Sequence, residues 1–109
     1  MTYRSLSHDY HDSYLTNIVI GPDNSISLEV ELNAAIVGGS SVSNITIRDI
    51  ENYDEVVSFL VPVLSSDSHP DYLDQIVGLQ YYNKNTRQLL LGLCNHGDLI
   101  ISFKQLHEY

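Results

Sequence analysis

The stretch SHDYHDSYL, residues 7–15, gathers side chains whose types could do chemistry. It holds two His-Asp pairs, His8-Asp9 and His11-Asp12, with one residue between them. Zinc is commonly bound by histidine together with a carboxylate, so a metal site is one interpretation. An acid/base site and the start of the first strand are the two others.

The spacing of the histidines argues against the metal site. On a strand, an offset of three residues sends His8 and His11 to opposite faces, and the sequence that follows is strand-like. Downstream of this stretch, the chain also lacks an HxxH or HExxH pair that would complete a zinc site. The remaining histidines are isolated in the sequence: His69, His96 and His107.

A hydrolytic site is equally hard to build from this stretch. Ser7 and Ser13 lie near His11, but adjacency along a chain is not triad geometry, and no GxSxG turn is present. The simpler interpretation is that Asp12 and Ser13 accept backbone N–H groups where the first strand begins, with His11 bonding to a neighbouring loop. We therefore predict no catalytic residue, no metal and no cofactor.

Period-two alternation predicts strands on both sides of a turn at residues 21–24. Residues 14–20 precede this turn, and in residues 25–32 Ile26, Leu28, Val30 and Leu32 alternate with polar residues. Gly, Pro, Asp and Asn supply the turn, so we expect an antiparallel hairpin. A small-residue loop at 38–44 then precedes a further strand at 45–50.

A helix is predicted next, because the hydrophobic period changes after residue 51. Asn52 and Glu55 have the spacing of a helix cap, Pro62 would end the helix, and an edge strand is the alternative. The stripe facing the core would consist of Val56, Val57, Leu60 and Val61. Three more strands are expected at 72–82, 87–94 and 98–106, joined by turns at 83–86 and 95–98.

Together these elements predict one domain over residues 1–109, in the α+β class and mostly antiparallel β. About six strands should form a curled sheet or a small sandwich, with one short helix over an open end. Cys94 lies in an apolar run and should be buried. No segment is long and apolar enough to cross a membrane, and residues 1–10 do not resemble a secretory signal, which predicts a cytoplasmic protein.

Charge narrows the range of partners. The chain has five Lys and Arg and 14 Asp and Glu, which gives a net charge of -9. This charge would repel nucleic acid and anionic membranes. Between residues 49 and 74 there are seven acids and no Lys or Arg, a pattern that favours a basic partner or simply keeps the surface solvated. Tyrosines flank this block, and tyrosine is enriched at interfaces. The predicted contact residues are Asp49, Glu51, Tyr53, Asp54, Glu55, Asp67, Asp71, Tyr72 and Asp74.

The order of segments HDSYLTNIVI, SISLEVEL, NITIRDI and LLLGLCNHGDLIISF resembles small bacterial immunity proteins of polymorphic-toxin and contact-dependent growth inhibition systems. In several such families His-Asp-Ser/Ala opens the first strand, as His11, Asp12 and Ser13 do here. A later strand reads apolar-x-apolar-x-Asp-apolar, which matches Ile45, Ile47, Asp49 and Ile50. Tyr10 departs from the pattern, which has Phe or Leu there.

The resemblance implies a non-enzymatic inhibitor that binds a cognate basic toxin, often a nuclease, and blocks its active site or substrate channel. An acidic block could imitate the charge of the toxin's substrate and speed association. Two alternatives stay open. One is a small metal-dependent hydrolase using His8, His11 and Asp12, and the other is a non-catalytic assembly subunit that pairs through exposed strand edges.

Overall fold

A computed structural model of the chain describes residues 3–4, 10, 12–32, 41–65, 71–83 and 87–108. These form eight strands and one helix. The strands are β1 (Tyr3–Arg4), β2 (Ser13–Gly21), β3 (Ser25–Leu32), β4 (Ser41–Arg48), β5 (Asp74–Asn83), β6 (Arg87–Leu93), β7 (Gly97–Phe103) and β8 (Gln105–Glu108). The helix, α2, spans Tyr53–Leu64.

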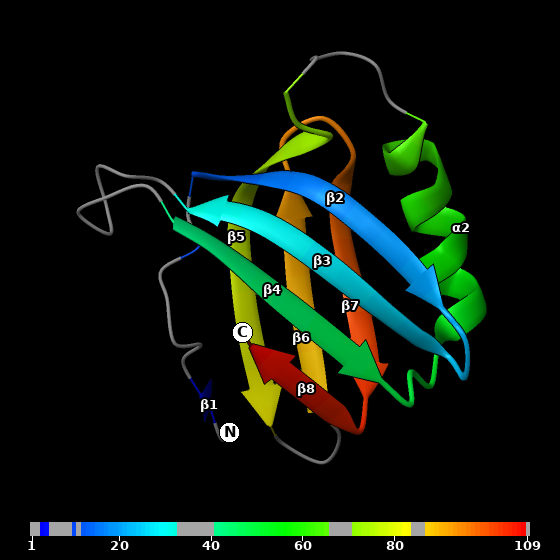
Figure 1. The fold of residues 1–109 in the computed structure, drawn as a ribbon. Helices are drawn as coiled ribbons and strands as arrows, with labels where there is room; N and C mark the ends of the chain where they lie inside the picture. The colour runs from blue at the N-terminus through cyan, green and yellow to red at the C-terminus, as the bar shows by residue number, and fades with distance from the viewer. Residues whose placement is uncertain are drawn as a thin grey trace.

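All strands belong to one antiparallel sheet in the order β7-β6-β5-β2-β3-β4-β8, with β1 added to β5. The sheet curls on itself, so that β2, β3 and β4 lie across β5, β6 and β7 (Figure 1). The two strands at the ends of this order follow each other in the chain, since only Lys104 separates β7 from β8. The predicted α+β class, mostly antiparallel and with one helix, is confirmed.

The β2–β3 hairpin forms as its alternation predicts. Ile26, Leu28, Val30 and Leu32 are all buried in the core. Asp23 and Asn24 adopt positive φ angles of 57° and 56° in the turn, a conformation that Asp and Asn tolerate better than most residues. Ile45 and Ile47 of β4 face the same core and are fully buried.

Helix α2 packs against β2 and β7 (Figure 1). It begins after Asn52, as predicted, but it does not end at Pro62. Only one intrahelical bond is lost at a proline, and the helix continues for two residues with Ser65 N–H bonded to the Val61 carbonyl at 3.1 Å. The predicted stripe was wrong at Val61, which is 47% exposed. The buried side chains of α2 are Val56, Leu60 and Val63.

Other expectations need correction. The segment predicted as one strand over 98–106 is two strands, because the chain bends at Lys104 and changes partner from β6 to β4. β4 begins at Ser41, inside the predicted loop, since Val42–Asn44 pair with β3. Cys94 is exposed rather than buried, because it lies in the turn after β6.

Within the described part of the chain, no helix has the length and apolar character that a membrane crossing requires.

Candidate functional site

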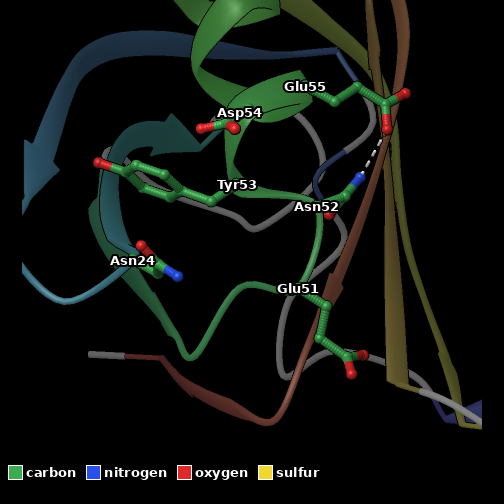
Figure 2. A pocket seen from close by; sticks show the side chains of 6 residues that line it. All are labelled: Asn24, Glu51, Asn52, Tyr53, Asp54 and Glu55. Carbon is green, nitrogen blue, oxygen red and sulfur yellow. Dashed lines mark hydrogen bonds between the residues drawn. The ribbon is translucent and has the colours of Figure 1, made fainter.

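A shallow pocket of about 240 Å³ lies at the corner where α2 begins (Figure 2). Its walls come from the β2–β3 turn, the segment before α2, and the first helical turn. The lining residues are Asn24, Glu51, Asn52, Tyr53, Asp54 and Glu55. We call this region, together with the neighbouring Asp23 and Asp49, the acidic corner.

Backbone contacts bring the parts of the acidic corner together. The N–H of Ile50 donates to the Asn24 carbonyl at 3.0 Å, and the Ile50 side chain is buried. The Tyr53 hydroxyl donates to the Gly21 carbonyl at 3.3 Å. Asp49 turns the chain with a φ of 54°. The segment before α2 is therefore fastened to the β2–β3 turn, and its acidic side chains are left outside.

The carboxylates of the acidic corner are exposed. Within the described residues, no basic group lies within salt-bridge distance of Asp49, Glu51 or Asp54. Asp54 and Glu55 also complement the positive end of the helix dipole, which gives them a structural reason to be there. Asp49 and Glu51 precede the helix, so the dipole does not account for them.

Four predicted contact residues line this pocket, namely Glu51, Tyr53, Asp54 and Glu55, and a fifth, Asp49, lies two residues before them in the chain. Sequence reasoning missed Asp23 and Asn24, because they lie about 30 residues earlier and join the corner only through the hairpin turn. The signal was present in the turn sequence GPDN, which combines a predicted hairpin tip with an acid.

Asp71 and Tyr72 lie elsewhere. The Tyr72 ring packs on Tyr14 with centroids 4.7 Å apart, at the start of β2. Leu73 N–H bonds the Leu15 carbonyl, whereas the acidic corner is fastened at Gly21, six residues further along the strand, or roughly 20 Å away. The acidic block of the sequence is thus divided between two ends of β2.

Asp74 was wrongly predicted as a contact residue, because its side chain is fully buried. Its carboxylate accepts hydrogen bonds from Gln75 N–H at 2.8 Å, from Asn95 N–H at 3.1 Å and from Asn95 Nδ2 at 3.0 Å. His96 Nδ1 lies 2.6 Å from the same carboxylate. Asp74 therefore fixes the β6–β7 turn against the start of β5 and is unavailable to a partner.

The SHDYHDSYL stretch is described only in part, with His8, Asp9 and His11 outside the described residues, as is Asp67. Asp12 has a φ of 62° and donates its N–H to the Ile76 carbonyl at 2.9 Å, while Ser13 N–H bonds the Tyr10 carbonyl. The chain does turn into β2 at these two residues. The expected side-chain role fails for Ser13, whose buried Oγ has no hydrogen-bond partner among the described residues.

Tyr10 is buried with its hydroxyl between two partners. The hydroxyl donates to Glu108 Oε2 at 2.7 Å and lies 2.9 Å from Ser43 Oγ. Burial raises the pKa of the Tyr10 phenol well above its usual range; the bond to Ser43 lowers it, and the bond and charge of Glu108 raise it further. A Phe or Leu at this position would leave Ser43 and Glu108 without that partner.

The described residues contain no cluster of three or more His, Cys, Asp or Glu side chains arranged to hold a metal ion. Comparison of the chain with protein-family models, with curated proteins and with solved structures gave no match.

Proposed function

We propose that this chain is an immunity protein that binds a cognate basic toxin domain and blocks its active site or substrate channel, and that the acidic corner is its docking surface. The observation that carries the proposal is the set of exposed carboxylates at one pocket, none of which forms a salt bridge with a basic side chain among the described residues. A nuclease is the class of toxin that fits best, because it must be basic to hold its substrate. We place this activity in the cytoplasm.

Charge supports a protein partner over nucleic acid. The chain carries a net charge of -9, and exposed carboxylates would repel a phosphate backbone. A positively charged surface would be attracted, and complementary charge raises association rates by steering the encounter. The acidic corner therefore favours a partner rich in Lys and Arg.

Shape supports a broad contact rather than a small-molecule site. The pocket is open, and its walls are mostly polar side chains and turns. Tyr53 offers part of its ring at this surface while its hydroxyl is held by Gly21, so little side-chain entropy remains to be lost on binding. A held aromatic ring among exposed carboxylates suits the basic face of a folded protein.

The test compares two variants that each remove two charges. In the first, Glu51→Gln and Asp54→Asn change the acidic corner; in the second, Glu29→Gln and Glu31→Gln change exposed acids at the other end of β3. A pull-down at low salt supplies the basic partner, and stopped-flow mixing then gives the association rate. For every positive charge of the partner that lies within about 10 Å of the two removed carboxylates, the corner variant should associate about threefold more slowly than the wild type. This slowing should be smaller at high salt, because ions screen the charges.

The distant variant has the same net charge, so it controls for the overall field of the protein. Equal slowing by the two variants would place the contact elsewhere. A basic partner that binds while its own activity continues undiminished would contradict the inhibitory role. Failure of the wild-type chain to bind any basic protein at low salt would overturn the proposal as a whole.

A further inference from the structure

Among the described strands, none pairs with the outer edge of β7, so the backbone groups along that edge have no strand partner. β6 occupies one side of β7, so the other side presents the N–H and C=O groups of alternate residues such as Ile100 and Ser102. Exposed edges of this kind pair readily with a strand of another chain. Ile100 is itself 49% exposed, which adds an apolar side chain to that edge.

Glu51 and Asn52 occupy this edge. Glu51 N–H donates to the Ser102 carbonyl at 2.7 Å. The Asn52 side chain accepts from Ser102 N–H at 2.9 Å through Oδ1 and donates from Nδ2 to the Ile100 carbonyl at 2.7 Å. One side-chain amide thus offers an acceptor and a donor to β7, as a peptide group of a paired strand would.

Asn52 is also the residue before α2, where a side chain commonly caps the helix. Here it makes no capping bond. Its amide serves β7 instead, and Nδ2 donates as well to Glu55 Oε1 at 3.0 Å (Figure 2). The Asn52 side chain therefore bonds to the edge of the sheet and does not cap the helix.

We infer that Glu51 and Asn52 form an edge lock, which occupies β7 and prevents it from pairing with a second copy of this chain. The released edge would present Ile100 and Ser102 to the same edge of another copy, giving an antiparallel continuation of the sheet. Because the lock also lines the acidic corner, opening it alters the docking surface. The inference does not depend on the proposed partner and is tested without one.

The variant Asn52→Ala removes both the acceptor for Ser102 N–H and the donor to Ile100 and Glu55. Asn44→Ala is the matched control, since Asn44 is exposed on β4 and away from this edge. Hydrogen exchange of the Ser102 amide measures the lock, and sedimentation over a wide concentration range measures self-association. In Asn52→Ala, protection of Ser102 should fall by about tenfold or more, and self-association should strengthen at least about tenfold.

Adding Ile100→Lys to Asn52→Ala should return the mass to that of the wild type, because a charged edge residue opposes strand pairing. If Asn52→Ala does not fold, Asn52→Ser is measured in its place. An unchanged Ser102 amide would show that Asn52 does not lock the edge. An exposed Ser102 amide without any change in mass would show that the edge does not pair, and either result overturns the inference.

Discussion

Replacing Asp74 should destabilise the fold strongly, because its carboxylate is the common acceptor for four donors. Asp74→Ala leaves all four without that partner. The side chains of Asn95 and His96 are near the surface and can turn to water, so most of the cost comes from the amides of Gln75 and Asn95. At 1.5 to 3 kcal/mol for each bond to a charged group, less the relief of no longer burying a charge, we expect a loss of about 3 kcal/mol.

Asp74→Asn should cost about half as much, because its amide oxygen can still serve the donors on one side of the group. Urea denaturation followed by circular dichroism measures both values, and the thermal midpoint should fall by roughly 15 °C for Asp74→Ala. Asp98→Ala, an exposed acid, is the control and should change stability by less than about 0.5 kcal/mol. A loss below about 1 kcal/mol for Asp74→Ala would refute the view that this carboxylate organises the β6–β7 turn.

Two further substitutions address residues 10–13. Tyr10→Phe should lower stability at neutral pH by about 1 to 2 kcal/mol through the lost bonds to Ser43 and Glu108. Because burial raises the pKa of Tyr10, its contribution to stability should be constant below about pH 10 and fall above it, by up to ~1.4 kcal/mol per pH unit. Urea titrations of Tyr10→Phe should lack that part of the slope above about pH 10. Ser13→Ala should be neutral or stabilising by up to about 1 kcal/mol in thermal unfolding, since the buried Oγ has no partner among the described residues; a clear loss would reveal one.

The strands could be predicted because their signals are local. Alternation within β3 identifies the buried face, and turn residues such as Asp23 and Asn24 mark where the chain reverses. The bend at Lys104 gives no such signal. It is decided by which strand lies alongside, β6 before the bend and β4 after it, and a single sequence does not contain that information.

The acidic corner was predictable only where its residues are consecutive. Asp49 to Glu55 stay together because few residues separate them, whereas Asp71 is carried to the other end of β2. Asp74 shows why burial of a polar residue is hard to predict, since an acid among other acids in the sequence is expected to be exposed to solvent. Its burial depends on four donors, three of which belong to Asn95 and His96, about 20 residues further along the chain.

The bend at Lys104 has a consequence for how the chain folds. The contacts within β2–β3–β4 and within β5–β6–β7 are local, while the two seams that join these halves, β2 with β5 and β4 with β8, link residues about 60 positions apart. Closing long loops costs entropy before any contact compensates it, so we expect both three-stranded halves to form first. The curled sheet would then be completed late, when the four-residue strand β8 pairs with β4.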